Sequence, residues 1–286
     1  MKLKVYESPN EFLEKVEDFL LKEEVVNNLA LGLLYTLNKP NSHYKDAFLA
    51  CVQKDETPVL VMVMTPPYNL ILYGTGEAVT EGIKVAVTSI KGTGMNLLGV
   101  IGPEALAEEF ASEWLQQVGC GLEIKMEQKI YKLEKVNKVP LSNGKLRLAT
   151  EDDLELIVDW TYQFSLVTPE QLTLEGARKL AERGIEESSI FIWDDNGPVS
   201  MAKKARPTKN GIVVNLVFTP QEFQRKGYAT TCVAQVSQQL LNEGFTFCSL
   251  YTDLANPISN SIYMKIGYEP IIDSVVYGFL YEREEA

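Results

Sequence analysis

VFTPQEFQRKGYAT, residues 217–230, is the stretch of this chain that decides the fold. It predicts an apolar strand, a short loop and the first turn of an amphipathic helix, with Gly227 where the loop becomes helix. The first turn of a helix exposes unpaired backbone N–H groups and the positive end of the helix dipole. Arg225 and Lys226 add two cations beside that turn. This combination favours the binding of an anion such as a diphosphate.

A second stretch, NPISNSIYMKIGY, covers residues 256–268 and predicts a short helix. Asn256 suits the N-cap position and Pro257 the first helical position. With about 100° of rotation per residue, Asn256, Asn260 and Tyr263 then lie on one stripe, away from the isoleucines. A helix this short does not need such a stripe for its own stability. The stripe is therefore a candidate ligand-binding surface, and a solvated polar face is the alternative interpretation.

Together the two stretches resemble the GNAT N-acetyltransferase superfamily, whose members transfer an acyl group from acyl-CoA, usually to an amine. The diphosphate loop of that family has Gln or Arg, two variable residues, Gly, one variable residue, then Gly or Ala. Gln224, Gly227 and Ala229 match this pattern. The resemblance implies an α/β (α+β) fold, in which a mixed central sheet is flanked by helices. It also implies acetyl-CoA, or another acyl-CoA, as the cosubstrate.

The resemblance further implies which residues contact the cosubstrate. In the family, the strand before the loop splays from its neighbour and extends its backbone hydrogen bonds to the pantetheine arm. The loop amides bind the diphosphate, and asparagines of the later helix hydrogen-bond the pantetheine. The expected cofactor-binding residues are Val217, Phe218, Thr219, Gln224, Arg225, Lys226, Gly227, Tyr228, Ala229, Thr230, Asn256 and Asn260. For the loop taken alone, an ordinary strand–turn–helix is the alternative.

Tyr263 is the expected catalytic residue, because the family places a tyrosine near the sulfur of the cosubstrate. A phenol with an ordinary pKa of about 10 can protonate a departing thiolate of comparable basicity. The general base stays open. Some family members carry a glutamate on the strand before the loop, but Asn215 is among the inward candidates here, and exposed carboxylates such as Glu222 and Asp253 are more often solvated. We expect direct attack by a free amine, with the N–H of Phe218 or a neighbour stabilising the oxyanion.

Composition narrows the class of protein. At 286 residues, with 45% apolar residues, the chain is long enough for two packed domains. Its net charge of −12 argues against nucleic-acid partners, which need a basic surface. The longest purely apolar run, residues 59–64, is far too short to cross a bilayer, and the N-terminus lacks an apolar signal core. We therefore expect a cytoplasmic protein without a membrane partner.

The histidine and cysteine content excludes several chemistries. His43 is the only histidine, so a serine–histidine or multi-histidine metal mechanism would depend on it alone. It lies in a polar stretch after Pro40 that indicates a solvated loop. Without CxxC spacing, we expect no metal site and four reduced, mostly buried thiols, at Cys51, Cys120, Cys232 and Cys248.

The order of predicted elements indicates two tandem copies of one fold. Residues 139–286 have the GNAT order, with strands at 145–149, 189–193, 198–206, 211–219, 245–251 and 271–281, and helices from 152, at 169–183, 227–241 and 256–266. Residues 1–138 repeat much of it without the motifs, with strands at 3–6, 48–52, 59–64, 70–73 and 121–133 and helices at 10–21, 25–37 and 104–118. We predict a degenerate copy over residues 1–138 and the acyl-CoA site within residues 139–286.

The predicted function is an acyl-CoA-dependent N-acyltransferase that moves acetyl to a primary amine of a small molecule or amino acid. Motifs confined to the second half are similar to glycine N-acyltransferases, which favours an amino-acid acceptor. The acceptor would lie near residues 160–168, where Trp160, Tyr162 and Phe164 are candidate lining residues, although aromatics at this spacing are more often core. We expect a monomer or homodimer.

Two alternatives stay open. The chain could be a non-catalytic acyl-CoA-binding sensor or interaction protein, with the first half as its partner surface. Tyr263 argues for chemistry, whereas the absence of a carboxylate from the motif strand argues weakly against it. Aminoacyl transfer from charged tRNA is the other alternative, and the acidic charge of both halves together with the intact loop disfavours it.

Overall fold

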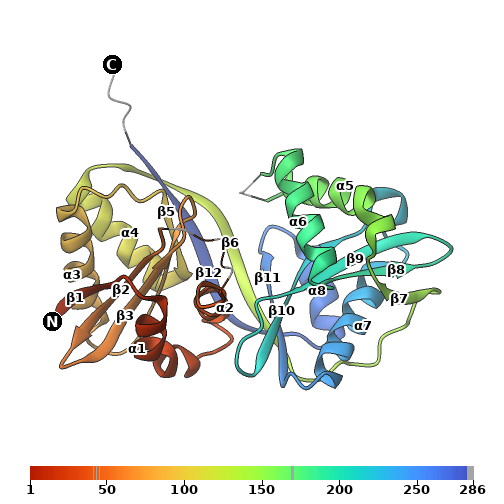
Figure 1. Cartoon of the computed structure of the whole chain (residues 1–286), viewed down its shortest axis with the longest axis horizontal. Coiled ribbons are helices and arrows are strands. Elements are labelled where there is room, and N and C mark those ends of the chain that lie inside the picture. The colour runs from red at the N-terminus through yellow and green to blue at the C-terminus, as the bar shows by residue number, and fades with distance from the viewer. Residues whose placement is uncertain (41, 43, 45, 169–170, 282–286) are drawn as a thin grey trace, which may run out of the picture. The chain divides into compact units, whose positions relative to one another are not determined.

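The chain folds into two compact units in the computed structural model, which describes all residues except 41, 43, 45, 169–170 and 282–286. The first unit contains Met1–Lys129 and the C-terminal segment from Ile272, and the second contains Ile130–Ile271. His43 and the first two residues of the helix predicted at 169–183 lie outside the described residues. Each unit is a sheet covered by helices (Figure 1). No described helix is both long and apolar enough to cross a membrane.

The first unit has the strand order β1-β2-β3-β4-β5-β12, followed by part of β6. β4 and β5 are parallel, whereas the pairs β1/β2, β2/β3, β3/β4 and β5/β12 are antiparallel. Its elements are β1 (Lys2–Tyr6), α1 (Pro9–Leu21), α2 (Asn28–Leu37), β2 (Phe48–Lys54), β3 (Thr57–Met64), β4 (Leu70–Gly74), α3 (Val79–Gly92), β5 (Gly99–Pro103), α4 (Glu104–Val118), the first part of β6 (Gly121–Leu133) and β12 (Glu269–Leu280).

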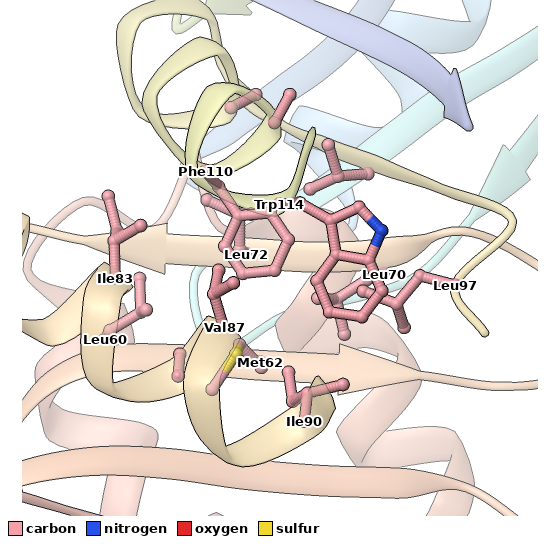
Figure 2. Close-up of a cluster of buried hydrophobic side chains, with 14 of the residues drawn as sticks. Leu60, Met62, Leu70, Leu72, Ile83, Val87, Ile90, Leu97, Phe110 and Trp114 are labelled. Carbon is pink, nitrogen blue, oxygen red and sulfur yellow. The ribbon is translucent and has the colours of Figure 1, made fainter. Parts of the chain in front are cut away.

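Helices cover both faces of the first sheet, which explains the apolar run at residues 59–64. Successive residues of a strand point to opposite faces. Leu60 and Met62 therefore pack under α3 and α4, while Val61 and Val63 pack under α1 and α2. Figure 2 shows the α3–α4 side, where Phe110 and its neighbours on α4 lie against side chains of β3 and β4. A strand buried on both faces becomes continuously apolar.

The second unit has the strand order β11-β10-β9-β8-β7, preceded by the end of β6. β10 and β11 are parallel, and β7, β8, β9 and β10 pair antiparallel with one another in turn. Its elements are β7 (Lys145–Leu148), α5 (Leu154–Ser165), α6 (Leu174–Glu186), β8 (Ile190–Asp194), β9 (Pro198–Ala205), β10 (Gly211–Phe218), α7 (Tyr228–Asn242), β11 (Phe247–Asp253) and α8 (Pro257–Ile266).

The second unit has two apolar clusters, one on each face of its sheet. The α5–α6 face packs Trp160, Ala181, Ile192 and Met201 into one cluster. On the other face, residues of α7 and α8 pack against β11 and the buried side of β10. This mixed sheet with helices on both sides confirms the predicted fold class.

Most predicted elements are present within a few residues, but α3 and β5 were not predicted. The stripe Ile83, Val87 and Ile90 that buries α3 lies between glycine-rich turns, which obscured it. β5 contains Gly99 and Gly102, and a Cβ at either position would collide with a neighbouring strand's carbonyl oxygen. Tertiary packing thus requires residues that single-sequence rules assign to turns.

The compact units are composed differently from the segments 1–138 and 139–286 expected from the sequence. Residues 274–278 of β12 pair with β5, and Val275, Tyr277 and Phe279 enter the core beneath α3 and α4. β5 would otherwise be an edge strand with a row of unpaired backbone groups. The last strand of the chain therefore completes the sheet of the first unit.

Candidate functional site

β10 and β11 separate partway along their length. The two strands pair only over Gly211, Ile212 and Val213, whose partners on β11 end at Ser249. Both strands continue, β10 to Phe218 and β11 to Asp253. Beyond these pairs, the two strands are not paired with each other, which is the splay expected from the sequence.

A β-bulge lies at the point of separation. The register between β10 and β9 shifts between Asn215 and Phe218, and Leu216 has a φ of 49°. A left-handed backbone is rare for leucine and costs about 1–3 kcal/mol, a cost found most often at functional sites. Bulges also bend a strand and interrupt its ladder. The bulge therefore leaves backbone groups of β10 near residues 215–217 available to a ligand.

The loop after β10 is anchored to the strand by side chains. Gln224 Nε2 donates to the carbonyl oxygen of Thr219 at 3.1 Å, and the Thr219 hydroxyl lies 2.8 Å from that of Ser200. Arg225 and Gly227 have φ values of 63° and 83°. These left-handed residues turn the chain sharply into the N-terminus of α7. The residues that match the loop pattern, Gln224, Gly227 and Ala229, therefore lie between a strand and a helix, as that pattern requires.

The start of α7 presents free amide groups. Its first intrahelical hydrogen bond runs from Thr231 N to Gly227 O at 3.0 Å. The N–H groups of Tyr228, Ala229 and Thr230 precede that bond and have no acceptor within the helix. Arg225 and Lys226 are exposed beside them. These features are the ones from which we predicted anion binding at this helix terminus.

Residues outside the motif hold this loop. Ser142 Oγ donates to Lys226 O at 2.9 Å, and the Tyr228 hydroxyl donates to Asp195 Oδ2 at 2.6 Å. A Cβ at Gly227 would come within 2.9 Å of Ser142 Oγ and of no other atom nearby. Sequence reasoning missed Ser142 and Asp195, because nothing in their local patterns connects them to a loop distant in the chain.

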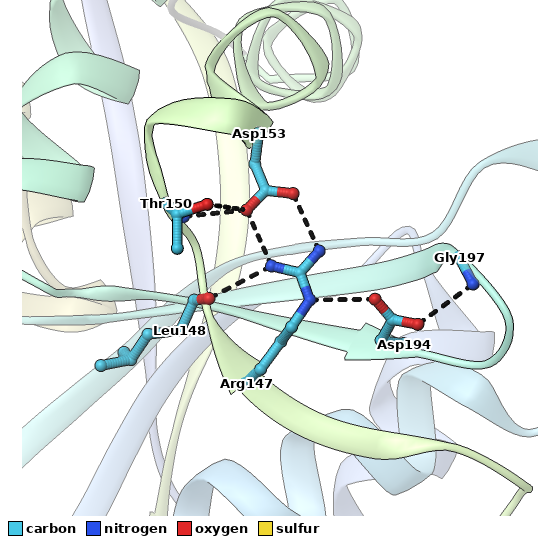
Figure 3. A network of polar contacts seen from close by, with 6 residues as sticks. All are labelled: Arg147, Leu148, Thr150, Asp153, Asp194 and Gly197. Carbon is cyan, nitrogen blue, oxygen red and sulfur yellow. Dashed lines mark hydrogen bonds and ion pairs between the residues drawn. The ribbon is translucent and has the colours of Figure 1, made fainter.

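The β8–β9 turn that carries Asp195 is fixed by the network in Figure 3. Arg147 binds Asp153 through two hydrogen bonds of 2.7 and 2.8 Å and Asp194 through one of 2.9 Å. These hydrogen bonds lower the pKa of Asp153 and Asp194, which stay charged at neutral pH. Asp194 also accepts from Gly197 N at 3.0 Å. The network is structural, since it holds the turn against which Tyr228 is anchored.

The two motif asparagines have structural partners. Asn256 caps α8 by accepting a hydrogen bond from Ser259 N at 3.1 Å. Asn260 Nδ2 donates to Asp253 O at 3.0 Å and to Asn256 O at 2.7 Å, and Asn260 Oδ1 accepts from the Tyr131 hydroxyl at 3.1 Å. These bonds fix α8 against the end of β11. The polar stripe therefore has a structural use that neither interpretation predicted, since its asparagines bond within the protein and Tyr263 is buried. Any contact with a ligand would be additional.

Tyr263 is buried beside the separated strands. Its side chain is only 8% exposed, and its ring packs edge-on against Tyr268 at 5.9 Å, in the cluster that also contains Leu250 of β11. Burial raises the pKa of Tyr263 to about 12. Its hydroxyl makes no hydrogen bond with another described residue. The phenol therefore stays protonated at neutral pH, and the raised pKa makes it a weaker acid than the ordinary phenol expected from the sequence.

Other candidate residues have structural roles. Trp160 is 4% exposed and packs against Phe218 at 6.0 Å, so it belongs to the core. Burial raises the pKa of the Cys232 and Cys248 thiols to about 12, which argues against nucleophilic use. Asp253 accepts a hydrogen bond from Ala255 N at 2.7 Å. The described residues hold no group of three or more His, Cys, Asp or Glu suited to a metal.

Comparisons with known proteins agree with this geometry. Residues 195–277, from the turn at Asp195 through the loop and α8 into β12, match the family model described as FR47-like protein. None of the curated proteins matches the chain. The family match therefore covers the candidate site but less than a third of the chain.

Solved structures match nearly the whole chain. An acetyltransferase of the GNAT family from Colwellia psychrerythraea has a TM-score of 0.62 at 12% identity, covering 99% of this chain and 100% of its own. A GCN5-related N-acetyltransferase from Sphaerobacter thermophilus has a TM-score of 0.63 at 12% identity, covering 96% and 94%. A tandem GNAT protein from the clavulanic acid biosynthesis pathway has a TM-score of 0.58 at 10% identity, covering 97% and 98%. These likenesses confirm the tandem GNAT fold.

Proposed function

We propose that the chain is an acyl-CoA-dependent N-acyltransferase, which moves acetyl from acetyl-CoA to the primary amine of a small molecule or amino acid. The observation that carries this proposal is the alignment of three features along β10: the separation from β11, the bulge at Leu216 and the open helix terminus at Gly227. Each exposes backbone donors that pair with a different part of acetyl-CoA. An ordinary strand–turn–helix has no reason to combine all three.

The residues present fit the diphosphate and the pantetheine arm of acetyl-CoA. The amides of residues 228–230, with Arg225 and Lys226, would bind the diphosphate. Backbone groups of residues 217–219 would hydrogen-bond the pantetheine amides, which resemble peptide groups. Gly227 lets the diphosphate approach the backbone closely, because a Cβ at this position would meet only Ser142 Oγ. The Asn215 side-chain oxygen is buried and has no hydrogen-bond partner among the described residues, as expected at a ligand-binding position.

The chain's own groups can carry the transfer. Bound acetyl-CoA supplies a thioester, and the acceptor nitrogen attacks its carbonyl carbon. A backbone N–H at the β10 bulge stabilises the oxyanion. As the carbon–sulfur bond breaks, Tyr263 donates its phenolic proton to the departing sulfur. The proton lost by the amine passes to water, because β10 carries Asn215 and no carboxylate at the point of separation, and Tyr263 regains a proton from water after the thiol leaves.

A non-catalytic acyl-CoA-binding protein is the second candidate. The absence of a carboxylate from β10 favours it, since such a protein needs the cofactor contacts but no base. The two candidates differ in one measurement, which is acceptor-dependent release of the CoA thiol.

Titration calorimetry with acetyl-CoA tests the shared part of both candidates. We expect one site per chain, and we expect Gly227→Glu to weaken binding by about 100-fold or more, through bulk and charge beside the diphosphate. The matched control is Gly76→Glu, because Gly76 also has a positive φ, of 93°, just before a helix. Equal losses in both variants, or no binding by the folded wild type, would refute the proposal.

A further inference from the structure

A lysine lies on the α5–α6 face of the sheet, directly across from the residue where the bulge begins. Lys203 of β9 is the cross-strand partner of Ile190 and of Asn215. Cross-strand partners share a face of the sheet, and Ile190 packs in the α5–α6 cluster. Lys203 therefore lies on that face, one strand from the separation of β10 and β11. Its neighbour Lys204 points to the opposite face, over the Phe191 ring at 5.7 Å.

Charged side chains of both signs lie near Lys203. The charges of Arg183 and Arg206 act on it unfavourably, and the charge of Glu187 acts favourably. Two other cations and one anion thus surround a half-buried ammonium group, in a chain whose net charge is −12. Burial, and then the arginines, lower the pKa of Lys203. Lys203 makes no ion pair with a described carboxylate, and Glu187 acts on it from beyond ion-pair distance.

Buried polar atoms lie on the same face. Ser249 is fully buried, and it alternates along β11 with Cys248 and Leu250, which pack on the α7 side. Ser249 therefore faces the α5–α6 side at the last β10–β11 pair. Neither its hydroxyl nor the Asn215 side-chain oxygen has a hydrogen-bond partner among the described residues. Buried acceptors left unpaired cost free energy, so their presence indicates a ligand that donates hydrogen bonds.

We infer that the acceptor is an amine that also bears a carboxylate, as an amino acid does. Lys203 binds the carboxylate, and Asn215 and Ser249 accept hydrogen bonds from the amine, which is thereby held at the bulge. This inference rests on the proposed acyltransferase function and names its acceptor class. It makes Lys203 a specificity-determining residue, because it acts on a part of the acceptor that does not react.

The test compares free amino acids with their carboxamides as acceptors, at saturating acetyl-CoA, with release of the CoA thiol as the readout. We expect kcat/KM to be at least about 10-fold higher for the acids, the effect of one charge-assisted hydrogen-bonded pair. Lys203→Met should raise KM for the acids by a similar factor, leave kcat nearly unchanged and leave the carboxamides unaffected. Lys203→Arg should retain most of the preference for the acids.

Lys204→Met is the matched control, since it removes a charge from the adjacent residue on the other face and should leave the preference unchanged. Acetyl-CoA affinity, measured in each variant, shows whether the cofactor site is intact and the protein folded. If acetyl-CoA binds but the acids and carboxamides react equally, or neither reacts, the inference is overturned while cofactor binding stands. A fall in kcat without a change in KM for Lys203→Met also overturns it, because that would assign Lys203 to proton transfer. Failure of the wild type to bind acetyl-CoA refutes the proposed function itself.

Discussion

Two strand–helix connections occupy equivalent places in the tandem fold. One joins β4 to α3 in the first unit, and the other joins β10 to α7 in the second. Four residues, 75–78, link β4 to α3, whereas nine, 219–227, link β10 to α7. A Cβ added at Gly74 would meet Val79 at 2.6 Å and Leu60 at 2.9 Å. The end of β4 is therefore closed by apolar side chains, whereas a Cβ at Gly227, just before α7, would meet only the polar Ser142 Oγ, beside two exposed cations.

The strands before these connections differ in the same sense. β4 pairs with β3 from Ile71 to Gly74 without a register shift. β4 and β5 are paired at Leu70 and Ile71, and Gly102 of β5 still lies so close to the carbonyl oxygen of Leu72 that a Cβ would come within 2.7 Å of it. β10, by contrast, has the bulge at Leu216, at the point where its pairing with β11 has ended. A regular ladder satisfies its own backbone groups and leaves none for a ligand.

The helices that follow complete the comparison. Counted from the N-cap, the positions of Asn256, Asn260 and Tyr263 in α8 correspond in α4 to Pro103, Ala107 and Phe110. Phe110 is fully buried beside Trp114, as Figure 2 shows. The same architecture is thus completed with apolar packing in the first unit and with polar groups in the second. This difference is why we expect a single acetyl-CoA site per chain.

The largest effect of a point substitution within this comparison should come from Tyr263→Phe, which gives α8 the aromatic ring that α4 has at Phe110. We expect turnover to fall by about 100-fold, because the sulfur loses its proton donor, with acetyl-CoA affinity nearly unchanged. The rate of thiol release, followed by stopped-flow or steady-state kinetics, measures turnover, and calorimetry measures the affinity. Unchanged turnover would remove Tyr263 from the mechanism.

The pH dependence of the wild type sharpens the same point. Burial raises the pKa of Tyr263 to about 12, and only the protonated phenol can donate. The contribution of Tyr263 should therefore persist to pH 10 and disappear only as the pH rises through its pKa. A loss of turnover attributable to Tyr263 ionisation below pH 10, seen in the wild type and absent from the phenylalanine variant, would contradict the burial of the hydroxyl.

A smaller effect is expected from the cations of the longer connection. Arg225→Ala should weaken acetyl-CoA binding by about 10-fold, and the loss should shrink at high salt because exposed charges are screened. Lys84→Ala, which removes an exposed cation from α3 in the first unit, is the control and should have no effect. Equal weakening by both substitutions would mean that net charge, rather than the geometry of the second connection, attracts the anion.

The smallest effect concerns the helix cap that α8 has and α4 lacks. Asn256→Ala should lower the free energy of unfolding by about 1 kcal/mol, the usual cost of a lost N-cap, and leave acetyl-CoA affinity unchanged. Denaturant unfolding and calorimetry measure the two quantities. A loss of affinity without a loss of stability would restore the direct cofactor contact that the family resemblance implied for Asn256.

The sequence by itself predicted most strands and helices of residues 139–286 and placed the candidate site among them. The spacing of Gln224, Gly227 and Ala229 predicts the anion-binding helix terminus, because local backbone chemistry decides what a left-handed glycine before a helix can do. Alternation and helical periodicity placed nearly every strand and helix, because burial of one face imposes a period on the local sequence.

Only the tertiary structure decided the features that depend on residues distant in the chain. β5 could not be recognised because its glycines are required by the approach of other strands. Three features join segments far apart in sequence. β12 completes the sheet of the first unit, Ser142 and Asp195 anchor the loop, and the Tyr131 hydroxyl hydrogen-bonds Asn260. The bulge at Leu216 and the pairing of Lys203 with Asn215 depend on strand register. Register is set by pairing between strands, and no single segment encodes it.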